Sequence, residues 1–84
     1  MDIAVEISLY PLDQEFIPRI QAFIDRLNRH EGLKIITNHL STQVFGDHAR
    51  IFEVLREEMG TSFAAGGKSA FVVKFVGPYP VPDG

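Results

Sequence analysis

Glu6 and Lys74 lie within alternating, strand-like segments, one near each end of the chain. If the two segments pair as neighbouring strands, the carboxylate and the ammonium group can form a cross-strand ion pair, which favours the charged form of both. The same two groups could instead orient a bound ligand. Nucleophilic catalysis would need a serine or threonine held by a base, and none stands in such a motif. These residues therefore favour binding over catalysis.

Three evenly spaced histidines, His30, His39 and His48, could suggest a metal site. They fall at a helix end, a hairpin and a helix start, so no two have ligand spacing on one element. Since the chain also lacks cysteine, we predict surface histidines and no metal site. Residues 66–68, Gly-Gly-Lys, resemble a phosphate loop but follow a helix and precede a strand, the reverse of the required order. We interpret them as a helix stop.

Composition limits the class of protein. The chain has 84 residues, 45% apolar and 23% charged, which is typical of one small globular domain and excludes disordered, fibrous and membrane classes. Basic residues are scattered and the net charge is −3, so nucleic-acid binding has no electrostatic footprint. The lack of cysteine and of a leader-like start predicts a cytoplasmic location. Because so small a core leaves little stability, we expect homo-oligomers.

The first half of the chain predicts a strand and then a helix. Residues 3–10 alternate apolar and polar side chains, and Pro11, which cannot donate to a ladder, ends this strand. Apolar residues at helical spacing follow. Pro18 is tolerated only in a first turn, so the helix should begin near Phe16, and Gly32 supplies its stop.

The second half predicts a hairpin and another helix. Two short β-favouring runs, 33–38 and 42–45, form the hairpin. Asp47 is the N-cap of a helix that we expect to continue through Gly60 to Ala65.

The last strand completes the fold. Residues 69–76 are β-branched and aromatic. The order β-α-β-β-α-β predicts an α+β, ferredoxin-like sandwich, with two helices on one face of a four-stranded antiparallel sheet. We expect one domain over residues 1–77 and a proline-rich tail over 78–84 that is extended or disordered. Odd-numbered residues of the first and last strands should face the helices. The even-numbered residues then form an open face of the sheet that is rather apolar.

Four short segments occur in a set order along the chain: 6–12 (Glu-Ile-Ser-Leu-Tyr-Pro-Leu), 32–34 (Gly-Leu-Lys), 42–47 (Thr-Gln-Val-Phe-Gly-Asp) and the last strand with its lysine. Together they resemble the thiamine-binding, YkoF-like family of small ferredoxin-like domains, over residues 3–76. The resemblance implies a non-enzymatic binder of thiamine or its hydroxymethylpyrimidine moiety, with no metal and no other cofactor. It also implies self-association, as a dimer or tetramer.

Position by position, the resemblance places ligand-binding groups on the first strand, the hairpin and the last strand. Aminopyrimidines offer ring-nitrogen acceptors and an amino donor, which polar side chains can complement while an aromatic ring covers the flat face. The resemblance implies Glu6, Ser8, Asn38, Thr42 and Lys74 as ligand-binding residues, and the chemistry of the ring adds Tyr10, whose side chain can cover its flat face. Phe45 is a second candidate for covering the ring.

Two positions depart from the family pattern. Ser41 stands where members often have glycine, and Phe45 stands where they often have a charged residue. Both positions affect the shape of the pocket, and so they leave the ligand open.

Two other functions stay open. The apolar open face also fits an oligomeric interaction or regulatory module with no small ligand, in which Val72 would lie in the interface. A small dimeric α/β-barrel-type enzyme would need an acid or base between sheet and helices, where the odd-numbered strand positions are uniformly apolar.

Overall fold

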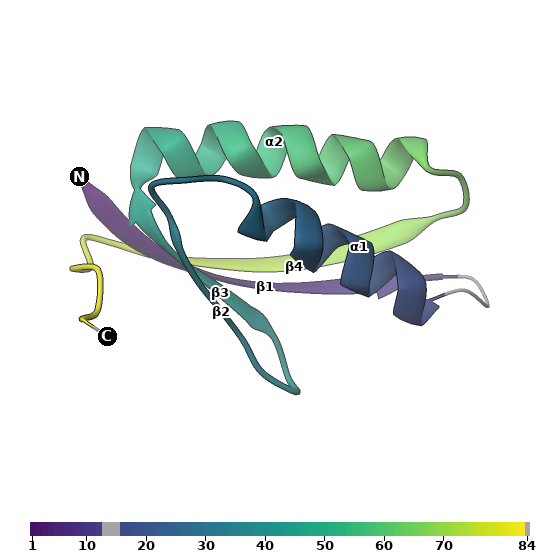
Figure 1. Ribbon diagram of the computed structural model, residues 1–84, viewed down its shortest axis with the longest axis horizontal. Coiled ribbons are helices and arrows are strands. Elements are labelled where there is room, and N and C mark those ends of the chain that lie inside the picture. Colours follow the sequence, from purple (N-terminus) through teal and green to yellow (C-terminus); the bar gives the residue numbers. More distant parts are fainter. Residues whose placement is uncertain (13–15, 84) are drawn as a thin grey trace.

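A computed structural model describes residues 1–12 and 16–83. Its elements are β1 (Asp2–Pro11), α1 (Phe16–Asn28), β2 (Lys34–Thr37), β3 (Thr42–Asp47), α2 (His48–Ala64) and β4 (Ser69–Val76). The strands form one antiparallel sheet in the order β2-β3-β1-β4, and both helices cover the same face (Figure 1). The predicted ferredoxin-like α+β fold is confirmed.

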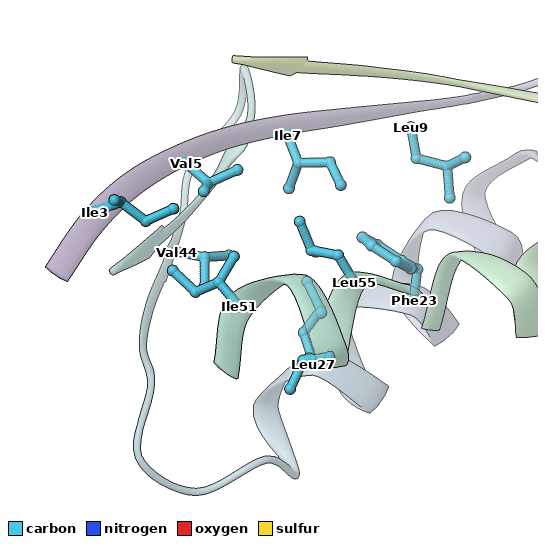
Figure 2. Close-up of a cluster of buried hydrophobic side chains, with 10 residues drawn as sticks. Ile3, Val5, Ile7, Leu9, Phe23, Leu27, Val44, Ile51 and Leu55 are labelled. Atoms are coloured by element: carbon cyan, nitrogen blue, oxygen red, sulfur yellow. The ribbon is translucent and has the colours of Figure 1, made fainter. Parts of the chain in front are cut away.

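The core lies between the sheet and the helices. The odd-numbered residues of β1 are buried there, as the alternation predicts: Ile3, Val5, Ile7 and Leu9 (Figure 2). Their partners come from α1, β3 and α2 and include Phe23, Leu27, Val44, Ile51 and Leu55. Burial of these side chains is the main force that holds the helices on the sheet.

β1 ends at Pro11, which pairs with Ser69 of β4 and extends the strand one residue beyond the predicted 3–10. The N–H of Leu12 donates to the carbonyl of Lys68 at 2.8 Å, so even-numbered residues here direct their backbone groups toward β4. Pro11 is odd-numbered, and its missing N–H would point away from β4. The strand therefore stops at Pro11 as predicted, and it includes Pro11 because the missing donor costs no bond to β4.

Both helices begin where the sequence predicts. The first starts at Phe16, but it ends at Asn28, well before Gly32, because bonds from the N–H of Arg29 and His30 to carbonyls three residues back close its last turn. Asp47 caps the second helix by accepting from the N–H of Arg50 at 3.2 Å.

That second helix passes Gly60 as expected and ends at Ala64. In the hairpin, β2 is shorter than predicted and β3 is longer, because β3 stays paired with β1 through Gly46 and Asp47. Only glycine fits at position 46 without a shift, since an added Cβ would lie 2.6 Å from Leu33 Cδ2. No helix in the described part of the chain is both long and apolar enough to cross a membrane.

The proline-rich segment after Gly77 folds back along the open face of the sheet, at the end where β1 begins (Figure 1). The N–H of Tyr79 donates to the carbonyl of Asp2 at 2.9 Å, and its ring centroid lies 6.0 Å from that of Phe45. Lys34 Nζ donates to the carbonyl of Pro82 at 2.9 Å. Residues 78–83 therefore contact β1, β3 and β2, while Gly84 lies outside the described residues.

Candidate functional site

A cavity of about 240 Å³ lies between α1, the end of β1 and the loop that joins β2 to β3. We call it the hairpin cavity. Its apolar wall comes from β1 and α1: Ile7, Leu9, Ile20, Phe23 and Ile24. Its polar groups come from β1 and the hairpin: Ser8, Thr37, Asn38, His39, Ser41 and Thr42. Leu40 and the half-exposed ring of Tyr10 complete it.

The cavity exists because β3 is shorter than β1. The β1–β3 ladder ends at the pair Ile7–Thr42, whereas β1 continues to Pro11 with β4 as its only strand neighbour among the described residues. Beyond this point the hairpin loop turns back on itself. Asn38 Oδ1 accepts from the N–H of Leu40 at 2.8 Å and of Ser41 at 3.1 Å. The part of β1 beyond Ile7 therefore has no strand on this side, and α1 covers the space that is left there.

Four of the six predicted ligand-binding residues line this cavity: Ser8, Tyr10, Asn38 and Thr42. The hydroxyl of Thr42 is buried and lies 3.2 Å from that of Thr37. Asn38 uses its side-chain oxygen in the turn, and its Nδ2 donors have no partner among residues 1–12 and 16–83. The hydroxyl of Ser8 has no partner within the same residues. Donors from Ser8 and Asn38 are therefore available to a ligand.

The other two predicted residues lie on the open face. Glu6 and Lys74 are directly opposite in the β1–β4 register, with Lys74 Nζ 3.4 Å from Glu6 Oε1. They line a shallower hollow of about 230 Å³ together with Gln43, Phe45 and Tyr79. The structure thus divides the predicted site between two hollows.

Ser41 links the two hollows, a role that sequence reasoning missed. Its Oγ donates to Glu6 Oε2 at 3.0 Å. This hydrogen bond and the neighbouring Lys74 ammonium hold the pKa of Glu6 below its ordinary value. Glu6 is therefore a carboxylate that anchors the hairpin loop. In the sequence, Ser41 stands out only because family members often have glycine there, and no spacing pattern indicates that its partner is Glu6.

A second missed cluster joins the two helices. His30 Nε2 lies 2.6 Å from Glu58 Oε2, while Arg26 Nε donates to Glu58 Oε1 at 2.8 Å and Arg26 also donates to Ser62 Oγ at 2.7 Å. His30 is half-buried, so the prediction of three surface histidines was wrong for it. The partner is on another helix, and sequence spacing alone does not reveal it.

Glu58 is charged despite its burial. Burial by itself raises the pKa of this carboxyl, but the hydrogen bonds and charges of His30 and Arg26 outweigh it, and the pKa lies below its ordinary value. One oxygen each of Glu57 and Glu58 and a ring nitrogen of His30 lie within 4.8 Å of one another. Both oxygens of Glu58 are already engaged by His30 and Arg26, so we interpret the cluster as an ion-pair network between helices.

The model of the YKOF-related family matches residues 2–66, which include the whole hairpin cavity. The chain belongs to this family. The resemblance seen in the sequence is thereby confirmed. Of the six predicted site residues, only Lys74 lies outside the matched segment of this YKOF-related chain. No curated protein sequence matches it.

Solved structures share the fold of this YKOF-related chain. A Streptococcus pneumoniae protein superposes with a TM-score of 0.86 at 18% identity, covering 94% of this chain and 89% of that one. A Methanocaldococcus jannaschii protein gives 0.81 at 19% identity, covering 96% and 84%. A Thermotoga maritima protein, provisionally named for thiamine biosynthesis or salvage, gives 0.81 at 15% identity, covering 90% and 83%. These likenesses show a shared fold.

Proposed function

We propose that this YKOF-related protein binds thiamine or its hydroxymethylpyrimidine moiety in the hairpin cavity, as a homo-oligomer and without catalysing a reaction. The observation that carries the proposal is the gathering of Ser8, Tyr10, Asn38 and Thr42 around one apolar-walled cavity. The family and the provisional name of the Thermotoga maritima protein support the same ligand class.

The cavity matches the pyrimidine ring better than the whole of thiamine. Pockets for drug-sized ligands usually measure about 300–1,000 Å³, and this cavity of about 240 Å³ is smaller. A flat aminopyrimidine can place its faces against Phe23 and the aliphatic wall, and its polar edge toward Ser8 and Asn38. The cationic thiazolium ring of thiamine would then lie outside, near the half-exposed Tyr10.

The lining of the cavity supports binding without catalysis. Among its described residues only Tyr10 and His39 carry titratable side chains, and neither contacts a carboxylate there. General acid–base chemistry needs a positioned proton donor or acceptor with a tuned pKa. A small enzyme of the α/β-barrel type has less support than a binding protein.

Self-association is proposed through β4 and the open face. Val72 is 61% exposed and Val76 is 46% exposed, both on that face. The sheet ends with β4, whose outer edge has no strand partner in the described chain. An exposed apolar edge strand is a common pairing site. The same exposure favours the second candidate function, an interaction module with no small ligand.

Calorimetry with thiamine and with hydroxymethylpyrimidine tests the proposal, with light scattering on the same sample. We expect saturable binding at about micromolar affinity or tighter, and a mass above that of one chain. A folded oligomer that gives no heat with either compound would point to the interaction module instead. A Ser8→Ala variant should bind more weakly, whereas Glu57→Gln, on the exposed side of α2, should bind like the wild type.

A further inference from the structure

The backbone of β1 alternates in direction along its length. The N–H of Leu12 donates to Lys68, next to β4, whereas the carbonyl of Met1 accepts from the N–H of His48, directly after β3. In an antiparallel strand the N–H and C=O of one residue point the same way, and successive residues alternate. Odd-numbered residues of β1 therefore direct both groups toward β3. Leu9 is odd-numbered.

Leu9 lies just beyond the end of the β1–β3 ladder, whose last pair is Ile7–Thr42. If the same register continued, Leu9 would face Leu40. The N–H of Leu40 donates instead to Asn38 Oδ1 at 2.8 Å, inside the turn. Within residues 1–12 and 16–83, the N–H and C=O of Leu9 on this side have no partner.

An unpaired backbone edge at this position is unusual. Leu9 is only 8% exposed, and it lines the hairpin cavity. More than about 90% of buried backbone N–H and C=O groups in proteins are hydrogen-bonded. A donor and an acceptor left side by side in a cavity wall therefore need a partner that enters the cavity, either water or a ligand that displaces it.

We propose that the backbone N–H and C=O of Leu9 form the recognition edge for the ligand's heterocycle. The N–H donates to a ring nitrogen, and the C=O accepts from an adjacent exocyclic amino group. The ligand class is then a flat heterocycle with a neighbouring amino donor and ring-nitrogen acceptor, as in a 4-aminopyrimidine. The inference rests on the proposed function of the same cavity, and it assigns specificity to main-chain atoms.

A peptide strand is the other chemistry that a free edge could take, and the sequence disfavours it. Strand addition gains its affinity from a row of main-chain hydrogen bonds. The next odd-numbered residue is Pro11, which has no N–H, so the free edge offers a single donor at Leu9. The hairpin loop and α1 also bound the cavity. One donor and one acceptor suit a single ring.

The test compares hydroxymethylpyrimidine with the analogue in which hydrogen replaces the amino group. Calorimetry should show at least about tenfold weaker binding of the analogue, equivalent to about 1.4 kcal/mol. In NMR spectra, hydroxymethylpyrimidine should shift the Leu9 amide proton and slow its exchange with solvent. The Ile3 amide, which is paired with β3 and lies outside the cavity, is the internal control and should change little.

The outcomes separate this inference from the proposed function. Equal affinity for the two compounds, or a Leu9 amide unchanged at saturation, would overturn the role of Leu9 and leave the cavity as a binding site. No saturable binding of either compound would overturn the proposed function and this inference with it.

Discussion

Ser41 and Glu6 are joined by a hydrogen bond of 3.0 Å from the serine hydroxyl to the carboxylate, which connects the hairpin loop to the open face of the sheet. Lys74 approaches the other carboxylate oxygen to 3.4 Å. Glu6 thus acts on the hairpin cavity through Ser41, a residue of the cavity wall. Glu6 therefore holds the hairpin loop through Ser41, and Lys74 holds Glu6 in place.

Removing the Ser41 hydroxyl should raise the pKa of Glu6. The hydrogen bond from Ser41 is the largest cause of the lowered pKa, ahead of Lys74. In Ser41→Ala the pKa should move up toward the ordinary carboxyl value of 4.5, and NMR titration of the Glu6 side chain measures it. Ser8→Ala is the matched control, because Ser8 makes no contact with Glu6 among the described bonds. An unchanged pKa in Ser41→Ala would contradict the assignment.

Two substitutions at Asn38 should separate stability from binding. Asp at this position keeps the oxygen that accepts from Leu40 and Ser41, but it removes the Nδ2 donors. Asn38→Asp should therefore retain the wild-type melting temperature and bind hydroxymethylpyrimidine about tenfold more weakly. Asn38→Ala should also lose about 1 kcal/mol of stability, because the turn loses its acceptor.

Thermal unfolding and calorimetry on the two Asn38 variants check this. If Asn38→Asp bound the neutral ligand like the wild type, the donors of Asn38 would have no part in recognition.

Glu58 should make stability depend on acid pH. Its pKa is lower in the folded protein than the ordinary 4.5, so its contribution is fully present above that value and is lost as pH falls through the lower folded value. Glu58→Gln should flatten the fall in melting temperature below about pH 4.5. At neutral pH it should cost about 3 kcal/mol, because Arg26 and His30 lose a buried partner.

The control for Glu58 is its exposed neighbour, Glu57→Gln, which should keep the wild-type dependence on pH. Equal acid slopes for wild type and Glu58→Gln, from urea or thermal unfolding, would remove Glu58 from the explanation.

Val72→Glu should dissociate the proposed homo-oligomer. Val72 is 61% exposed on the open face, and a carboxylate buried there between copies would lose its hydration without gaining a partner. Light scattering should then give the mass of one chain. Ile17→Glu, at an exposed position on α1, adds the same charge away from the sheet and should leave the mass unchanged. A wild-type protein that is already monomeric would refute self-association.

Local patterns predicted most of the fold correctly. The alternation over residues 3–10 assigns each side chain to a face whatever its neighbours are, since the strand period is two. The Asp47 cap and the Phe16 start depend on backbone groups within one turn, and both are confirmed. Pro11 ends the strand as predicted but belongs to it, because the effect of a missing N–H depends on which neighbouring strand that N–H would face.

The site was harder to predict than the fold. Ser8, Tyr10, Asn38 and Thr42 meet in one cavity, but Glu6 and Lys74 line a separate hollow farther along the sheet. The positions of the polar residues in the sequence do not reveal that they fall into two separate hollows. It depends on where β3 ends relative to β1, and that length difference is a property of the pairing.

The amino-acid sequence by itself determined the element order, the helix-facing side of the first and last strands and the helix starts, because these follow from short-range spacing. Tertiary structure alone decided that Glu58 contacts His30 and Arg26, that Ser41 contacts Glu6, and that the backbone edge of Leu9 facing the cavity has no partner in residues 1–12 and 16–83. Contacts between distant segments depend on strand register and helix packing, and neither is encoded within a single local window.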